Sequence, residues 1–406
     1  MNFLKNKLCY IYIALWLLYK LQEMFMLRGI VAQLILGVLI IMSFYAFYEV
    51  NLNYKTGPYI KCLNVLLSVL TIYGIVYVIG SNTYHMGSFA DDKLSSYTYL
   101  QGLYISVLPI YAFYYFTLRR LITTQNLIIF FFIILFYNIL MYYQWYWSVN
   151  SQTSIDGMVN NTGFLFVPLI PMLQMVKMRD LWKYSLLIMI YAFIIMSMKR
   201  GAILTGTVML FLFMTRQIRV TSSKRLFSII GLSVVAISFI SWQLIDLYLS
   251  NSYFQNRFVL TLEGYSSNRD NLYTFFFDYF VNKTSWMEFL FGLGANGTIK
   301  LYGQYAHNDW LEFAINQGIF GLILYMIYWL AFAFEWKNYK GNKENKRVLG
   351  DIIIAYLLIA LFSMSFENMP LGATLCIGYC LAMNYAGKRL KQPGDDIIGS
   401  YLHPIK

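Results

Sequence analysis

Charged residues are scarce in this chain. Of its 406 residues, 12% are charged and 59% are hydrophobic, whereas about a quarter of the residues of an ordinary soluble domain are charged. A chain of this composition has too little polar surface to cover a water-soluble globule of its size. Together with a mean hydropathy of +0.54, the shortage of charge predicts a protein that crosses a membrane several times.

Histidine and cysteine are also rare. Three histidines and four cysteines leave little material for a metal site or a disulfide scaffold, so we expect no cofactor. Cys376 and Cys380 stand four residues apart in the last apolar segment, and we interpret them as packing residues. The segments that we place inside the cell contain no glycine-rich loop of the kind that cradles nucleotide phosphates, which disfavours an ATP-driven machine.

The formal net charge of +12 is spread between apolar segments. A basic excess in such positions reports membrane topology, so we expect no nucleic-acid partner. Three basic segments stand out, namely 216–225, 336–350 and the tail that begins at Lys388. Placing them in the cytoplasm puts both termini inside and leaves the outer segments slightly acidic.

Twelve apolar segments are long enough, or nearly so, to cross a hydrocarbon core of about 30 Å. They predict an all-α polytopic membrane protein. The first segment is the weakest, because Lys20 and Glu23 interrupt its end. The segments are 8–22, 30–50, 60–80, 97–118, 126–147, 163–178, 184–198, 201–215, 226–249, 318–335, 351–367 and 371–387.

One outer segment, 250–317, is much longer than the others. Long loops on a membrane scaffold often carry function. Within this loop, residues 286–296 (WMEFLFGLGAN) predict a short helix and a turn along the outer interface. The sequence has no linker rich in proline, glycine and serine, no repeat and no low-complexity tract, so we predict a single transmembrane domain over residues 1–406.

The pair Lys199–Arg200 interrupts an apolar stretch, 184–215, that is too long for one span and short for two. The turn between two such short helices is expected to lie recessed below the outer surface. Because a charge at that depth is costly, the pair is a candidate functional site. A snorkelling pair that caps two helices is the structural alternative.

Arg257 and Arg269 are predicted to lie on the same outer side as Arg200. A guanidinium group presents a fixed fork of donors that matches phosphate oxygens, and it stays charged at physiological pH. Three arginines that face one compartment would therefore suit a pyrophosphate. Solvated loop arginines are the alternative interpretation.

His307 precedes the tenth predicted span in AHNDWLEFAINQG. Histidine is the side chain best suited to accept a proton from a hydroxyl near neutral pH. Asn308 or Asp309 is expected to cap the helix that follows, so part of this polarity has a structural explanation. Asp91 and Asp92 are a second candidate, either as catalytic acids or as a solvated turn.

Three segments resemble motifs of the O-antigen ligase and polymerase superfamily of bacterial envelope glycosyltransferases. SMKRGAILTGTVMLFLF (197–213) is similar to the family's Ser-x-x-Arg-Gly segment at the start of a transmembrane helix. SSNRDNLYTFFFDYF and FLFGLGANG, within 266–297, are similar to its loop arginine and its Phe-Gly-x-Gly turn. AHNDWLEFAINQGIFGLILY (306–325) is similar to its His-Asn-x-x-Leu-Glu segment and is the most specific of the three.

This resemblance implies about twelve transmembrane helices with a catalytic core region at 197–325. It also implies transfer of a glycan from undecaprenyl pyrophosphate to an acceptor sugar hydroxyl, without nucleotide or metal, at the periplasmic face of the bacterial cytoplasmic membrane. Arg200 and Arg269 match the family's pyrophosphate-engaging arginines, and His307 matches its essential histidine.

Three further residues are expected to contact substrate in the same region, namely Arg257, Lys199 and Asn308. The expected partners are the undecaprenyl-pyrophosphate-linked oligosaccharide, the acceptor glycan and the lipid bilayer. For a polymerase, a flippase and a chain-length regulator are candidate partners as well.

Several functions share these motifs. We favour a polymerase of O-antigen or capsular polysaccharide, because the abundance of Ile, Phe, Tyr, Asn and Lys suggests AT-rich coding, which is common in polysaccharide loci. A ligase that moves the finished glycan to lipid A-core or another acceptor is the alternative. A lipid-linked glycan flippase or another transporter, and a glycosyltransferase that uses a polyprenyl-monophosphate sugar with Asp91 and Asp92, are further alternatives.

Overall fold

The computed structural model describes most of the chain as helices. The described residues are 2–24, 29–80, 96–151, 161–218 and 269–385, with the separate residues 238, 242, 245, 246, 248, 249, 255 and 259. Every element among them is a helix, so the all-α prediction is confirmed for this part of the chain. Four helices in it are long and apolar enough to cross a membrane, judged by length and composition alone, and they cover Ile30–Asn53, Pro58–Gly80, Leu127–Trp147 and Asp309–Lys337.

The first half of the chain forms helices α1 to α6. Pro109 begins α5 and divides the predicted span 97–118 into two helices, because proline lacks the N–H that would continue the preceding helix. The helices are α1 (Asn2–Met24), α2 (Ile30–Asn53), α3 (Pro58–Gly80), α4 (Ser96–Val107), α5 (Pro109–Leu118) and α6 (Leu127–Ser151).

Four shorter helices follow. They are α7 (Thr162–Phe166), α8 (Leu169–Met175), α9 (Asp180–Met196) and α10 (Arg200–Ile218). The predicted turn at Lys199–Arg200 is confirmed: α9 ends before it, and Met198 adopts a left-handed conformation with φ 52°. The predicted span 226–249 lies outside the described residues apart from a few separate positions.

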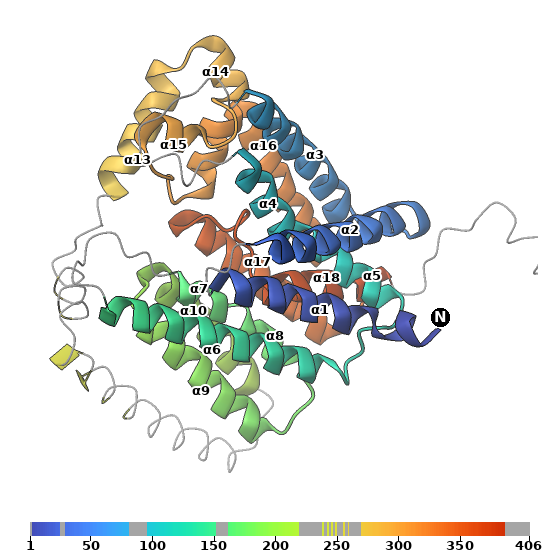
Figure 1. Ribbon diagram of the computed structural model, residues 1–406. Coiled ribbons are helices and arrows are strands. Elements are labelled where there is room, and N and C mark those ends of the chain that lie inside the picture. Colours follow the sequence, from blue (N-terminus) through green and yellow to red (C-terminus); the bar gives the residue numbers. More distant parts are fainter. Residues whose placement is uncertain are drawn as a thin grey trace, which may run out of the picture.

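Short helices precede the last three long ones, as predicted for the long loop. Figure 1 shows α13, α14 and α15 together at one end of the molecule, next to α16 and α3, whereas α6 to α10 lie at the other end. The elements are α13 (Arg269–Asp278), the π-helical turn η2 (Tyr279–Lys283), α14 (Trp286–Phe291), α15 (Gly297–Tyr302), α16 (Asp309–Lys337), α17 (Lys343–Phe362) and α18 (Leu371–Tyr385).

Aromatic side chains fill much of the core between α3, α5, α16 and α18. Tyr59 and Tyr328 are buried, and their hydroxyls lie 2.9 Å apart, which satisfies two polar groups that would be costly unpaired in this apolar interior. The helix α18 packs very close to α5, because Gly378 has no side chain. A β-carbon there would lie 2.6 Å from the carbonyl oxygen of Ile110.

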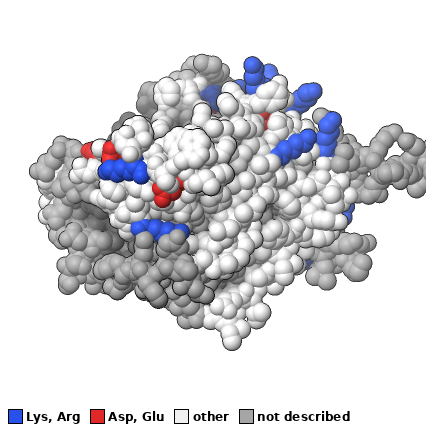
Figure 2. Space-filling model, turned by 90° about the horizontal axis from the view of Figure 1, so that it is seen from above, with Lys and Arg blue, Asp and Glu red and all other residues white. Residues whose placement is uncertain are grey.

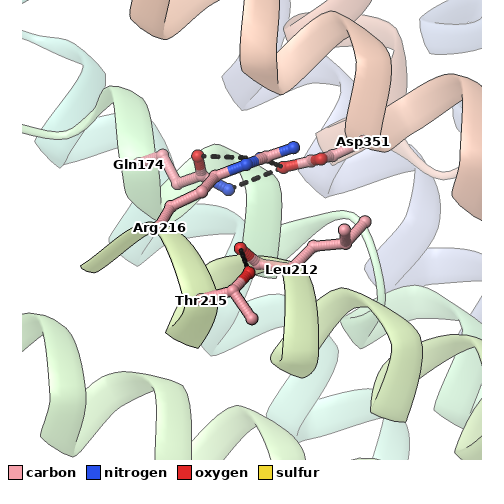
Figure 3. A network of polar contacts seen from close by, with 5 residues as sticks. All are labelled: Gln174, Leu212, Thr215, Arg216 and Asp351. Carbon is pink, nitrogen blue, oxygen red and sulfur yellow. Dashed lines mark hydrogen bonds and ion pairs between the residues drawn. The ribbon is translucent and has the colours of Figure 1, made fainter. Parts of the chain in front are cut away.

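A polar network joins three helices within the bundle (Figure 3). Asp351 of α17 is buried and accepts from Gln174 of α8 at 2.7 Å and from the Arg216 guanidinium of α10. The network therefore ties α8, α10 and α17 together near the end of α10 that is farther from Arg200.

Large apolar side chains cover much of the outer surface of the long helices. Ile30 and Ile41 of α2, Ile79 of α3 and Leu330 of α16 are at least 67% exposed. Figure 2, which looks down on the end of the molecule formed by α13 to α15, shows only scattered charges on its described surface. Exposed apolar surface of this extent is typical of helices that face lipid.

Candidate functional site

Several helix ends meet at the C-terminal end of α17. The Arg269 guanidinium, at the start of α13, donates to the carbonyl oxygen of Phe362 at 2.8 Å. Tyr273, one turn later on α13, donates to the carbonyl oxygen of Leu361 at 3.3 Å, and so does the side-chain amide of Asn308, also at 3.3 Å. The last carbonyls of a helix lack partners within it, so these contacts fix α13 and the start of α16 to α17.

The start of α10 reaches the same place. A β-carbon on Gly201 would lie 3.0 Å from the β-carbon of Phe362 and 3.2 Å from the ring of Phe164. The Lys199 ammonium nitrogen lies 5.9 Å from the centre of the Phe164 ring. Arg200 is exposed and Lys199 is half-buried.

We call this group of helix ends around residues 361–362 the helix-end cluster. Its members are Lys199, Arg200, Arg269, Tyr273, His307 and Asn308.

His307 is held in an uncommon backbone conformation. Its φ is 54°, in the left-handed region that residues other than glycine seldom adopt and that costs about 1–3 kcal/mol. Its carbonyl oxygen lies 3.2 Å from the Tyr273 hydroxyl, which shares its one proton between the His307 and Leu361 carbonyls. Asn308 next to it caps α16, because its side-chain oxygen accepts from the Leu311 N–H at 3.2 Å, as predicted. The imidazole is half-buried.

Glu312 fixes Ala306, the residue that precedes His307. This carboxylate is 5% exposed and accepts from the Ala306 N–H at 2.6 Å. It also accepts from the hydroxyl of Thr298 at 2.7 Å and from the amide of Asn316 at 3.0 Å. One buried side chain thus joins α15, the His307 turn and α16.

The two glycine motifs in the sequence pack directly against each other. The Leu293 N–H donates to the Ile315 carbonyl at 2.8 Å, next to Gly292, whose φ is 75°. Gly318 has a φ of 67° and makes a kink in α16. A β-carbon on Gly318 would lie 2.5 Å from the backbone of Leu290, so only glycine permits this contact. The predicted short helix and turn over 286–296 are therefore confirmed as α14 and the turn that follows it.

Asp309 holds the loop that follows α17. It is 3% exposed and accepts from the backbone N–H of Ser365 at 3.0 Å and from the Tyr325 hydroxyl at 2.9 Å. Because α16 and the loop after α17 share this carboxylate, the start of α16 is braced on two sides. The role of Asp309 is structural in this arrangement.

Burial changes the pKa of two groups in this region, Tyr273 in the helix-end cluster and Lys300 on α15. Burial raises the pKa of the Tyr273 phenol above its usual value, while the nearby Arg269 acts in the opposite direction. Tyr273 therefore stays protonated, and able to donate, throughout the physiological pH range. Burial lowers the pKa of Lys300 on α15, whose ammonium nitrogen lies 4.6 Å from the centre of the Tyr77 ring.

Of the six predicted site residues, the structure brings Arg269, His307 and Asn308 to the helix-end cluster through their own contacts. Lys199 and Arg200 lie there because the start of α10 packs on the end of α17. The sixth, Arg257, lies outside the described residues, as do Asp91 and Asp92. Sequence reasoning missed Tyr273 and Glu312. The sequence pattern could have indicated both residues. Tyr273 stands four residues after Arg269, on the same helix face, and Glu312 stands inside the His-Asn-x-x-Leu-Glu segment.

The described part of the chain contains no group of three or more His, Cys, Asp or Glu residues that could hold a metal ion. Among known proteins, no family model and no curated sequence matches the chain.

Proposed function

We propose that this protein is an integral membrane glycosyltransferase that moves a glycan from a polyprenyl-pyrophosphate donor to a sugar hydroxyl. The observation that carries the proposal is the meeting of Arg269, His307 and the Arg200 helix start around residues 361–362. Two guanidinium groups and an imidazole are the groups that such a reaction needs.

The arginines would act on the leaving group. When the bond between the anomeric carbon and the pyrophosphate oxygen breaks, negative charge builds on the pyrophosphate. Guanidinium donors match its oxygens geometrically. Arg269 is half-buried, so its field is less screened than it would be in water and can stabilise charge that develops on the leaving group.

His307 would act on the acceptor. The acceptor hydroxyl oxygen forms the new bond to the anomeric carbon while its proton passes to the imidazole. Direct attack of this kind inverts the configuration at that carbon. The hydrogen bonds that hold Ala306, Asn308 and the His307 carbonyl support this role, because a proton acceptor must be positioned before the reaction starts.

The finer topology belongs to the same proposal. It comprises about twelve transmembrane helices, both termini in the cytoplasm, and the helix-end cluster at the periplasmic side of the bacterial cytoplasmic membrane. The basic residues of 216–225 and 336–350 support this orientation, since basic loops remain on the cytoplasmic side. A polymerase of O-antigen or capsular polysaccharide is our first choice, with a ligase as the alternative.

The direct test is transfer by the purified protein in lipid nanodiscs, with an undecaprenyl-pyrophosphate-linked oligosaccharide as the donor. We expect His307→Ala to lower the rate roughly 10²–10⁴-fold, and Arg200→Ala or Arg269→Ala to lower it about 10²–10³-fold. Arg347→Ala, near the opposite end of α17, is the matched control and should retain the wild-type rate.

Full transfer by His307→Ala would remove the proton-accepting role, and an unchanged rate and donor affinity in both arginine variants would remove the pyrophosphate role. The same assay separates polymerase from ligase. Lengthening of the lipid-linked product with donor alone indicates a polymerase, whereas transfer only after addition of lipid A-core indicates a ligase.

A further inference from the structure

The loop between α17 and α18 carries a half-buried glutamate, Glu367. Within the described part of the chain, its carboxyl oxygens make no hydrogen bond or ion pair, and neither oxygen is enclosed away from water. An acidic side chain in a partly buried place is normally paired. The open carboxyl group of Glu367 therefore calls for an explanation.

The two neighbouring carboxyl groups are occupied. Asp309 accepts from the Ser365 backbone and from the Tyr325 hydroxyl, and Glu312 accepts three hydrogen bonds. These two groups hold the start of α16 and the elements around it, whereas Glu367 stays open to solvent.

The backbone of this loop places Glu367 beside the His307 turn. The N–H of Phe366, the preceding residue, donates to Asp309 at 3.3 Å, and Asp309 begins α16 two residues after His307. The carbonyl oxygen of Glu367 accepts from the Ser106 hydroxyl of α4. Because the loop is held by α16 and by α4, Glu367 has a defined position next to the proposed proton acceptor.

Tyr305, two residues before His307, lies close to Glu367. Burial and then the charge of Glu367 raise the pKa of the half-buried Tyr305 phenol. Among the described residues this hydroxyl has no hydrogen-bond partner, and it too is accessible to water. Glu312 fixes the next residue through the Ala306 N–H. Tyr305 and Glu367 thus form an open pair of one phenol and one carboxyl group.

The protonation of Glu367 suits a neutral ligand. Burial raises the pKa of Glu367 to about 8, and the neighbouring carboxyl groups of Glu312 and Asp309 act in the same direction. At neutral pH the group is mostly a carboxylic acid, which donates one hydrogen bond and accepts others.

These properties select among ligand classes. A metal ion would need several oxygen ligands, but Asp309 and Glu312 are already occupied. A pyrophosphate would need basic partners, and no basic side chain of the described residues acts on Glu367. A lipid chain would leave the open carboxyl group and phenol without partners. Sugar hydroxyls fit both groups, because each hydroxyl donates and accepts, and a sugar ring packs on an aromatic face.

We propose that Glu367 and Tyr305 bind hydroxyl groups of the acceptor sugar beside His307. This assignment rests on the proposed function, in which the acceptor gives its proton to His307. The pyrophosphate of the donor is expected at Arg200 and Arg269, so the two substrates approach the His307 turn from different sides.

The test measures sugar binding and transfer separately. Protein in phospholipid nanodiscs is titrated with the repeat-unit oligosaccharide of the host's surface polysaccharide, released from its lipid, and with inorganic pyrophosphate. Core oligosaccharide released from lipid A is the sugar probe for the ligase alternative. Saturation-transfer NMR reads sugar binding, and calorimetry reads pyrophosphate binding. In a second assay, the concentrations of lipid-linked donor and free oligosaccharide acceptor are varied independently.

Glu367→Met removes the carboxyl group and keeps the length of the side chain. We expect oligosaccharide binding to weaken about three- to tenfold, as for the loss of one hydrogen bond, and the KM for the acceptor to rise by a similar factor. Pyrophosphate binding and the KM for the donor should stay unchanged. Because the lost group pairs with none of the described residues, the thermal unfolding temperature should equal or exceed that of the wild type.

Glu367→Gln is the matched control. Glutamine, like a carboxylic acid, both donates and accepts, so this variant should bind the oligosaccharide within about twofold of the wild type. A second matched pair separates the two phenols of this region. Tyr305→Phe should weaken sugar binding about three- to tenfold, whereas Tyr302→Phe, whose exposed ring packs on Phe275 of α13, should bind like the wild type.

The proposal is overturned if the wild type binds neither oligosaccharide, or if Glu367→Met binds the sugar normally. A loss in Glu367→Gln as large as in Glu367→Met would also overturn it, because the ligand would then be a cation that needs the ionised carboxylate. A rise in the donor KM alone would overturn the acceptor assignment. Transfer by the wild type alongside any of these results leaves the proposed function intact. Sugar binding that depends on Glu367, without any transfer, would remove the proposed function and keep the sugar site.

Discussion

At the scale of single residues, the most informative feature is the support around His307. A histidine in the left-handed region needs external restraint. Tyr273 supplies it through the His307 carbonyl and Glu312 supplies it through the Ala306 N–H. The side chain proposed to accept the proton is thus placed by Tyr273 on α13 and Glu312 on α16.

Glu312→Gln tests this support. The glutamine keeps the size of the side chain but replaces one acceptor oxygen by a donor, so one of the three donors that Glu312 now satisfies loses its partner. We expect transfer to fall about tenfold, consistent with a loss of roughly 1–2 kcal/mol from an unmet hydrogen bond, and the pH profile of the rate to change. Activity from pH 5 to 9 and the thermal unfolding temperature are the measurements.

Glu288→Gln is the matched control for that variant. Glu288 completes a capping box with Ser285 at the start of α14, and glutamine can fill the same place. Both transfer and stability should stay near wild type. If Glu312→Gln unfolds at a lower temperature with unchanged rate and pH profile, its role is only structural.

At the scale of elements, two close approaches determine how helices meet. The turn after α14 packs backbone to backbone on the kink of α16, and the start of α10 packs on the end of α17. In both places a glycine removes the side chain that would hold the elements apart. The geometry of the proposed site therefore depends on the turns as much as on the long helices.

Gly318→Ala tests the α16 kink. The added methyl group would meet the Leu290 backbone at 2.5 Å, and it would also occupy a backbone conformation (φ 67°, ψ −164°) that essentially only glycine adopts. We expect loss of the folded arrangement of α14 to α16, seen as loss of transfer and lower resistance to proteolysis between 286 and 308.

Gly303→Ala introduces a left-handed alanine without a new contact. Gly303 has φ 82° and ψ −1° and nothing within 4 Å of its added β-carbon, so this variant should be destabilised only by the roughly 1–2 kcal/mol cost of a left-handed alanine. Equal effects of the two substitutions would show that the contact between α14 and α16 is unimportant.

The Arg216–Asp351–Gln174 network joins α8, α10 and α17 away from the proposed site (Figure 3). Asp351→Ala leaves Arg216 without its carboxylate in a partly buried place, where its side chain is 26% exposed. We expect a loss of about 1–3 kcal/mol in stability, below the usual 3–5 kcal/mol for a fully buried pair. Thermal unfolding in detergent measures it.

The double variant Asp351→Leu with Arg216→Met should recover most of that stability, because it removes both charges and keeps apolar volume. A double variant no more stable than Asp351→Ala would show that the polar contacts of the network stabilise the bundle and that packing alone does not replace them.

At the scale of the whole molecule, the proposed function depends on which side of the membrane the proposed site faces. The loop between α16 and α17 is basic, and the region of α13 to α15 lies at the opposite end of α16. In the proposed topology, in which α16 crosses the membrane, these two regions face opposite sides of it.

Cysteine labelling tests this arrangement. In a background without native cysteines, Lys283→Cys at the end of η2 should react with a membrane-impermeant maleimide in intact spheroplasts, since Lys283 is exposed. Lys343→Cys at the start of α17, also exposed, should react only after the membrane is permeabilised. The reverse pattern would place the helix-end cluster in the cytoplasm and exclude a periplasmic transferase.

The sequence alone predicted the elements whose signal is local. Long apolar runs predicted helices, the Lys199–Arg200 pair marked the end of one helix and the start of another, and Asn308 predicted a cap. Single spans were predicted at 97–118 and 163–178. In the structure, Pro109 and Pro168 divide these two spans into four helices. The number of spans stays a prediction.

Composition and charge by themselves determined the all-α membrane class, because too few charges are available to cover a soluble globule. Only the tertiary structure decided that Arg269 bonds to Phe362, 93 residues away, and that Glu312 and Tyr273 hold the backbone on either side of His307. The reason is physical: periodicity and caps report contacts within a few residues, whereas the site is made where the ends of distant helices meet.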